Sequence, residues 1–332
     1  MRVLFLFLSL FSSCCSLCQV ERFSFTRPKM GSPFQLIFFA PDSATANRLA
    51  EESFALVDFF NNIFSDYADS SELNRLCATA GKDSFVQVSD PLFEVLTTAR
   101  QAWKRTSGSF DITIGPLSRV WRKARREKRF PDAMEIEAAR LKTGFQSILL
   151  DEKRQRVKLL QAGTQLDLGG IAAGYIAQKI VDYLGSKGIR SALANASGDI
   201  ACSNAPPGKK GWTIAINVPG KANELLDKTI TLANKGVSTS GDVFQYTERD
   251  GKRYSHIINI KTGYGVTFQR NVTVIAPDGT TADWLATACS ILPLRKAKNL
   301  ARKLKSELLV AQMKGSSIET YSTKGINRYF DE

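Results

Sequence analysis

The chain has 332 residues, of which 43% are hydrophobic and 23% charged, and its formal net charge is +13 at pH 7. This composition is typical of a globular protein, and it excludes a disordered chain, a collagen-like repeat and a disulfide-dense miniprotein. No apolar run approaches the ~20 residues of a membrane-spanning helix, which excludes an integral membrane bundle.

The first 18 residues have the layout of a secretory signal peptide. Arg2 precedes the apolar run from Val3 to Phe11, and a stretch rich in Ser and Cys follows at 12–18. A buried N-terminal strand would explain the apolar run but not the sudden change to Ser and Cys. We therefore expect 1–18 to be a signal peptide and the chain to be exported, with a lipid anchor on Cys14 as the minority alternative.

The elements expected in the first half follow from hydrophobic periodicity and turn residues. The segment from Glu21 to Ala40 alternates and is interrupted at 29–33, which predicts two strands joined by a turn. Helices are expected over Ser43–Phe64, Asp90–Lys104 and Glu135–Thr143, and a hairpin over 147–150 and 156–160.

The second half is expected to add helices over Gly174–Gly188 and Thr281–Leu292. Strands are expected at 192–195, 212–218, 229–232, 236–239, 254–260, 272–276, 308–313 and 318–322. Hairpins dominate over a regular βαβ alternation, and no repeat or low-complexity linker interrupts the pattern. We therefore predict one continuous two-lobed unit of α+β class.

Positive charge is concentrated in two places. Seven basic residues lie between Arg119 and Arg129 against the single acid Glu127, and we expect a surface loop with an electrostatic preference there. The run lacks interleaved aromatic residues, so a nucleic-acid partner is not expected. Basic residues in the segment 295–305 have helical spacing around small and apolar residues, which predicts an amphipathic helix with a solvated basic face.

The segment from Leu166 to Tyr175 leads through the paired glycines Gly169 and Gly170 into a helix. Glycines let a ligand approach the backbone, and the free N–H groups of a helix start attract phosphate. A tight strand-to-helix turn would need the same residues. Both interpretations stay open from the residues alone.

Asp283 and Thr287 lie four residues apart in the expected helix over Thr281–Leu292, so they share one face. A carboxylate and a hydroxyl in that arrangement suit Mg²⁺, which prefers oxygen ligands. An acid favoured by the helix dipole and a packed threonine would give the same pattern. Taken alone, the spacing favours this second interpretation.

His256 is the only histidine of the chain. It lies in an expected strand beside polar residues and glycine turns, after the segment from Ser238 to Asp242. A lone histidine is more often structural, but in that setting it could act as a general base.

Taken in order, these segments resemble the ApbE family of flavin transferases, FAD:protein FMN transferases. The segments are MGSPF from Met30, SDYADSSELNRL from Ser65, FDITIGPL from Phe110, LDLGGIAAGY from Leu166, NASGDI from Asn195, STSGDVFQY from Ser238, RYSHIINIKTGY from Arg253 and VIAPDGTTADWLATA from Val274. The resemblance implies an ApbE-like, T-fold-related α+β fold over 19–332, with antiparallel sheets and packed helices.

The resemblance also implies a function. Family members bind FAD and Mg²⁺ and transfer FMN to a threonine hydroxyl of a target flavoprotein, releasing AMP. The implied acceptor is a subunit of an ion-translocating NADH:quinone reductase or a related electron-transfer complex. The implied location is the periplasm or the outer face of the inner membrane. Alternatives are an FAD-binding or storage protein, a Mg²⁺-dependent FAD diphosphatase without a protein acceptor and, more weakly, a flavin-binding redox enzyme.

Site residues carry over from the family motifs. The implied metal ligands are Ala172, through its backbone carbonyl, Asp283 and Thr287, and the implied catalytic residues are His256 and Asp283. The implied flavin-site residues are Met30, Tyr67, Ser71, Glu72, Phe110, Asp111, Gly115, Gly169, Gly170, Ser240, Gly241, Asp242 and His256. The chain departs from the family pattern at Ala173, where a lysine is usual, and at Ser197, Asn259–Ile260 and Gly265.

Overall fold

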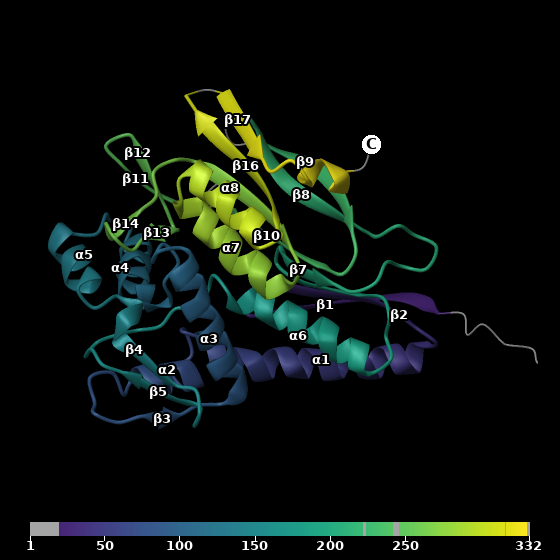
Figure 1. Cartoon of the computed structure of the whole chain (residues 1–332), viewed down its shortest axis with the longest axis horizontal. Coiled ribbons are helices and arrows are strands. Elements are labelled where there is room, and N and C mark those ends of the chain that lie inside the picture. Colours follow the sequence, from purple (N-terminus) through teal and green to yellow (C-terminus); the bar gives the residue numbers. More distant parts are fainter. Residues whose placement is uncertain (1–19, 222–223, 242–245, 316, 331–332) are drawn as a thin grey trace, which may run out of the picture.

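The computed structural model describes residues 20–221, 224–241, 246–315 and 317–330, and the expected signal peptide at 1–18 lies outside them. Two lobes share one hydrophobic core: a large sheet with its helices, and a smaller, mainly helical lobe (Figure 1). Within the described ranges, no helix has the length and hydropathy that a membrane crossing would need.

The large sheet has eight strands in the order β1-β2-β6-β7-β10-β15-β16-β17, and every neighbouring pair is antiparallel. Its strands are β1 (Glu21–Lys29), β2 (Ser32–Ala40), β6 (Ala192–Ala196), β7 (Asp199–Cys202), β10 (Lys235–Gly241), β15 (Arg270–Ala276), β16 (Glu307–Lys314) and β17 (Ser317–Ser322). The predicted α+β class with antiparallel sheets is confirmed.

Helices and a hairpin cover the sheet. The helices are α1 (Ser43–Phe64), α6 (Ala172–Ser186), α7 (Gly279–Ile291) and α8 (Leu294–Lys303). Helix α6 packs against β6 and β7, α7 against β10 and β15, and α1 against α6 (Figure 1). The hairpin of β8 (Trp212–Lys221) and β9 (Glu224–Leu232) contributes Trp212 and Ile230 to a second apolar cluster, with residues of β7, β10 and β16.

The helical lobe contains α2 (Glu72–Cys77), α3 (Asp90–Arg105), α4 (Gly115–Arg126) and α5 (Ala133–Arg140). It also contains a three-stranded sheet in the order β3-β5-β4, formed by β3 (Val86–Gln87), β4 (Ile148–Asp151) and β5 (Arg156–Leu159). Short 3-10 helices lie at Ile112–Ile114, Phe145–Ser147 and Ile326–Tyr329.

Two short hairpins connect β10 to β15 along the chain. They are formed by β11 (Tyr246–Arg249) with β12 (Lys252–Ser255), and by β13 (Ile258–Asn259) with β14 (Tyr264–Gly265). Ile258 and Ile260 pack against Leu117 and Trp121 of α4. The hairpins therefore join the sheet lobe to the helical lobe.

Two local predictions are wrong. The basic run from Arg119 was expected to be a loop, but α4 continues through it to Arg126 because Leu117, Trp121 and Ala124 give the helix a buried face. The strand expected at 254–260 is interrupted at His256, which lies in a bend between β12 and β13.

Candidate active site

A cavity of about 560 Å³ lies between the two lobes. Its lining comes from α4 and the turns that flank Phe110 and Gly169, from β10 and α7, and from the bend at His256. The sequence-predicted residues that line it are Tyr67, Phe110, Asp111, Gly169, Gly170, Ser240, Gly241, His256, Asp283 and Thr287. Residues from six of the eight motifs thus converge on one site.

Asp283 is held at the sheet side of this cavity. Helix α7 is capped by Asp278, whose side chain accepts a hydrogen bond from the Thr281 N–H, and this fixes the start of the helix. The Asp283 side chain is buried, and its Oδ2 accepts a hydrogen bond of 2.9 Å from the Gly174 N–H. Burial, and then the nearby charge of Asp199, raise the pKa of the Asp283 carboxyl well above its usual range.

Glycines permit the close contact between α6 and α7. A Cβ atom at Gly174 would lie 2.2 Å from the Gly279 carbonyl oxygen and 2.6 Å from the Cβ of Asp283. A Cβ atom at Gly170 would lie 3.0 Å from Thr287 Oγ1. The glycine-rich motif is therefore required for packing at the cavity wall, whatever ligand it also contacts.

Asp199, at the start of β7, is a second carboxylate in the cavity that the sequence analysis did not select. Its Oδ1 accepts a hydrogen bond of 2.5 Å from the Ser238 hydroxyl. Burial raises the pKa of Asp199 to about 6. The NASGDI motif contains this residue, but the sequence does not show that β7 lies beside α7, which brings Asp199 to the cavity.

The oxygen donors here fit Mg²⁺. Thr287 lies one turn after Asp283, and its Oγ1 is 3.4 Å from the Ser240 hydroxyl. Neither Asp199 nor Asp283 forms an ion pair with any residue in the described ranges. A hard divalent cation bound here would favour the ionised form of both carboxyls.

The full ligand set is not assembled by side chains alone. Ala172, the first residue of α6, lines an adjoining cavity of about 280 Å³ that shares Tyr67, Gly169 and Asp199 with the first. Among the described residues, no group of three or more His, Cys, Asp or Glu side chains could hold a metal ion. The expected set has one carboxylate, one hydroxyl and one carbonyl, so it does not require such a group.

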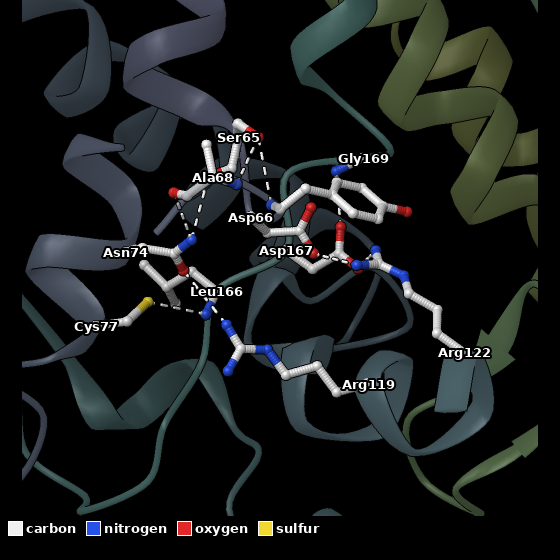
Figure 2. Close-up of polar contacts among 11 residues, drawn as sticks. Ser65, Asp66, Ala68, Asn74, Cys77, Arg119, Arg122, Leu166, Asp167 and Gly169 are labelled. Carbon is white, nitrogen blue, oxygen red and sulfur yellow. Dashed lines mark hydrogen bonds and ion pairs between the residues drawn. The ribbon is translucent and has the colours of Figure 1, made fainter. Parts of the chain in front are cut away.

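A cationic side of the cavity was also missed. The Arg122 guanidinium forms ion pairs with Asp66 and Asp167, the latter at 2.9 Å, and lies 4.4 Å from the centre of the Tyr67 ring. Figure 2 shows both carboxylates directed at Arg122, from the turn after α1 and from the segment before α6. Tyr67 is 77% exposed. Arg122 therefore supports an accessible aromatic ring at the cavity mouth.

Hydrogen bonds hold the turn that carries Tyr67. Ser65 Oγ accepts from the N–H groups of Tyr67 and Ala68, both at 3.2 Å. The Asn74 amide donates to the Ala68 carbonyl at 2.9 Å (Figure 2). Burial, and then the charge of Asp167, raise the pKa of Asp66, which remains paired with Arg122.

Arg125, one turn after Arg122, also lines the cavity and is half-buried. Burial and the neighbouring Arg122 charge lower its pKa. It forms no ion pair with a residue of the described ranges, unlike Arg122. The cavity thus has an acidic side at Asp199 and Asp283 and a cationic side on α4.

Several predicted flavin-site residues have other contacts. Ser71 caps α2 by accepting from the Asn74 N–H, and the Glu72 carboxylate accepts from the Ser89 N–H at 2.6 Å. Gly115 packs against Gln165, whose carbonyl oxygen would lie 2.5 Å from an added Cβ. These three do not line the cavity, so the structure gives them a role in supporting the surrounding turns.

The other predicted residues lie at or near the cavity. Met30 lines the adjoining cavity with Ala172. Asp111 lines the main cavity, but its carboxylate accepts from the N–H groups of Thr113 and Phe145, both at 2.9 Å, and burial raises its pKa. Phe110 packs its ring against Trp284. Asp242 lies outside the described residues.

Comparison with known proteins gives consistent matches. The model of the ApbE family matches residues 30–310. A protein of Klebsiella pneumoniae (strain 342) named FAD:protein FMN transferase is 33% identical over 262 residues, which are 79% of each chain. One of the same name from Haemophilus influenzae is 29% identical over 296 residues, which are 86% of each chain.

Solved structures match both lobes. The apo form of the flavinyl transferase ApbE from Pseudomonas stutzeri has a TM-score of 0.83 and 32% identity, covering 95% of this chain and 98% of that one. The flavin transferase ApbE from Vibrio cholerae has a TM-score of 0.85 and 25% identity, covering 94% of this chain and 100% of that one. The similarity therefore includes the segments that enclose the cavity.

Proposed function

The chain belongs to the ApbE family and is an FAD:protein FMN transferase, and from this premise we propose the details of its reaction. It transfers FMN from FAD to a threonine hydroxyl of an acceptor flavoprotein, releases AMP and requires Mg²⁺. The observation that carries this proposal is the pair formed by the half-buried Asp199 and the buried Asp283. The pair lacks a cationic partner among the described residues and lies beside the hydroxyls of Thr287 and Ser240.

Different residues of the cavity would bind the metal, the diphosphate and a ring of FAD. Asp283, Thr287 and the Ala172 carbonyl would hold Mg²⁺, which when bound supplies charge neutralisation for a diphosphate. Ser240 and Gly241 lie beside Thr287, where the diphosphate of FAD would bind. The exposed Tyr67 ring, supported by Arg122, offers one face to a planar ring of FAD.

The transfer exchanges one phosphorus–oxygen bond for another. The threonine oxygen forms a bond to the phosphorus on the riboflavin side, and the bond from that phosphorus to the bridging oxygen breaks. AMP leaves with the bridging oxygen, and FMN stays esterified to the acceptor. His256 takes the threonine proton, and it lines the same cavity as Asp283 and Thr287.

The acceptor and location are part of the proposal. We infer export to the periplasm or the outer face of the inner membrane from the signal-like layout of 1–18. The acceptor proposed is a subunit of an ion-translocating NADH:quinone reductase or a related electron-transfer complex. Mass determination of the natural N-terminus tests the location, since an intact Met1 on cytoplasmic protein contradicts export and a diacylglycerol mass on Cys14 supports the lipid anchor.

The reaction is tested with purified protein, FAD and a candidate acceptor, with Mg²⁺ present, chelated and then restored. We expect the acceptor mass to rise by one FMN less one water, with one AMP released per transfer. Both products should be lost on chelation and regained with Mg²⁺. Equal release of FMN and AMP without any acceptor adduct would instead identify a diphosphatase. Bound FAD with no product would identify a storage protein.

A further inference from the structure

A second cavity, of about 550 Å³, lies outside the site described above. It is formed by the C-terminal end of α3, the turn that follows β13, and α8. It shares the lining residues Ser109 and Ile291 with the active-site cavity. The two cavities are therefore contiguous, and we call this one the basic groove.

Four cations line the basic groove: Arg105, Lys261, Lys296 and Lys303. All four are exposed, and none forms an ion pair within the described ranges. No Asp or Glu side chain belongs to its lining in that part of the chain. The groove therefore carries uncompensated positive charge, which attracts an anionic partner.

The cations come from three separate segments. Lys296 and Lys303 are seven residues apart on α8, so they lie on one face with Asn299 and Leu300 between them. Arg105 ends α3, and Lys261 follows β13. The helix dipole favours basic residues at helix C-termini and accounts for Arg105 and Lys303 individually, but not for the convergence of all four on one groove.

The base of the groove is partly apolar. Leu292 and Leu300 are buried in it, and Pro293 is exposed. Anionic residues interspersed with an apolar side chain would match this combination of basic rim and apolar base. A nucleic acid fits less well, because no aromatic side chain for base stacking lines the groove in the described ranges.

We propose that the basic groove binds an acidic segment of the acceptor protein, so that the threonine beside this segment enters the active-site cavity. This inference rests on the proposed function and identifies how the partner is recognised. A protein segment is favoured over a membrane surface because the groove is concave and adjoins the cavity where the acceptor hydroxyl must react, with Ser109 and Ile291 lining both. The helical spacing of 295–305 predicted only a solvated basic face for this segment.

The test uses fluorescein-labelled hexaglutamate as the probe, with binding to the full chain measured by anisotropy at low salt without FAD or Mg²⁺. The groove variant is Lys296→Gln with Lys303→Gln. The matched control is Arg295→Gln with Lys298→Gln, which removes the same charge from the same helix outside the groove lining. We expect roughly fivefold or greater loss of affinity in the groove variant and less than about twofold in the control.

Equal losses in both variants would mean that hexaglutamate responds only to net charge, and would overturn the proposal. Vesicles of phosphatidylcholine with phosphatidylglycerol form a second arm. If the groove variant loses vesicle binding but keeps wild-type affinity for hexaglutamate, the groove serves a membrane and the proposal is wrong.

The transfer reaction separates this proposal from the proposed function. Hexaglutamate should raise the KM for the acceptor and leave the affinity for FAD unchanged, and the groove variant should show a higher acceptor KM with unchanged kcat. If the groove variant transfers FMN normally with the wild-type KM for the acceptor, only the proposal for the groove is contradicted. If the wild-type enzyme forms no FMN adduct on the acceptor but still binds hexaglutamate in the groove, only the proposed function is contradicted.

Discussion

The backbone N–H of Gly174 donates a hydrogen bond of 2.9 Å to Oδ2 of Asp283, and this bond connects the first turn of α6 to α7. An N–H at this position of a helix has no partner within the helix, so it needs an acceptor elsewhere. The side chain at the centre of the acidic side of the cavity is therefore also part of the contact between two core helices. Function and packing are coupled at this residue.

Asp283→Asn is expected to remove activity and keep the fold. The amide oxygen can still accept from Gly174, while the loss of charge should weaken Mg²⁺ binding and lower FMN transfer by orders of magnitude. Asp283→Ala leaves the buried N–H without an acceptor, which costs ~1–3 kcal/mol. Transfer rates of both variants at limiting Mg²⁺ test the role in metal binding, and their melting temperatures test the role of the hydrogen bond in stability. Wild-type transfer in Asp283→Asn would remove Asp283 from the metal site.

Gly174→Ala is expected to destabilise the protein and reduce transfer, because its Cβ would meet the Gly279 carbonyl oxygen at 2.2 Å. The control is Gly185→Ala on the same helix, where an added Cβ meets nothing within 4 Å. That change should stabilise the protein by up to ~1 kcal/mol, since alanine is the better helix former. Thermal unfolding compares the two variants. Equal stability of both would show that α6 and α7 can move apart at little cost.

Elements with strong local signals were predictable from the sequence. Helix α1 occupies the predicted range Ser43–Phe64, because its apolar periodicity is regular and Asp42 caps it with a bond to the Thr45 N–H. The β1–β2 hairpin likewise follows alternation and a turn. In both, local sequence and tertiary packing favour the same structure.

Sites that depend on contacts distant in sequence were less predictable. Arg122 meets Asp66 and Asp167, which are 56 and 45 residues away. Its position in a run of basic residues suggested only a charged loop. Ser71 shows the opposite case, since its motif matches the family but its hydroxyl serves as a helix cap. Motif matching locates the region of a site, and the contacts of each side chain then determine its role.

Arg122→Ala is expected to weaken FAD binding through Tyr67. The guanidinium supports the exposed ring at 4.4 Å and pairs with two carboxylates that repel each other without it. The expected loss of affinity is roughly two- to thirtyfold, which corresponds to ~0.5–2 kcal/mol. FAD affinity is measured for Arg122→Ala, for Tyr67→Ala and for the double variant, which tests whether the two residues act together. Additive losses would show that Arg122 acts independently of Tyr67, and Arg126→Ala controls for charge.

Glu135→Gln is expected to lower the melting temperature in a pH-dependent way. Hydrogen bonds from Arg129 and from the Asp132 N–H lower the pKa of Glu135 from 4.5 to about 2. A lowered pKa means that the stabilisation is fully present above the usual value and is lost as the pH falls toward the folded-state value. Melting temperatures of the wild type and the variant should therefore converge as the pH falls from about 4.5 to about 2. Glu248→Gln, at an exposed glutamate, is the control. A difference in melting temperature that does not change with pH, or a similar effect of the control, would contradict this prediction.

His256→Ala is expected to lose transfer while it retains FAD. The side chain lies in the bend between β12 and β13 and lines the cavity with Asp283 and Thr287, so it is placed near the reacting groups without belonging to the acidic pair. If it removes the threonine proton, its loss should cost roughly 10²–10⁴-fold in rate, the usual range for general-base assistance. The wild-type single-turnover rate should then rise with pH through the titration of a histidine, and the variant should lose this rise.

The rival role for His256 is a hydrogen bond to the adenine or the diphosphate, and loss of that bond would weaken FAD binding first. Both quantities are measured on one preparation of the variant. Weakened FAD binding with normal transfer at saturating FAD would exclude the base role and assign His256 to substrate binding.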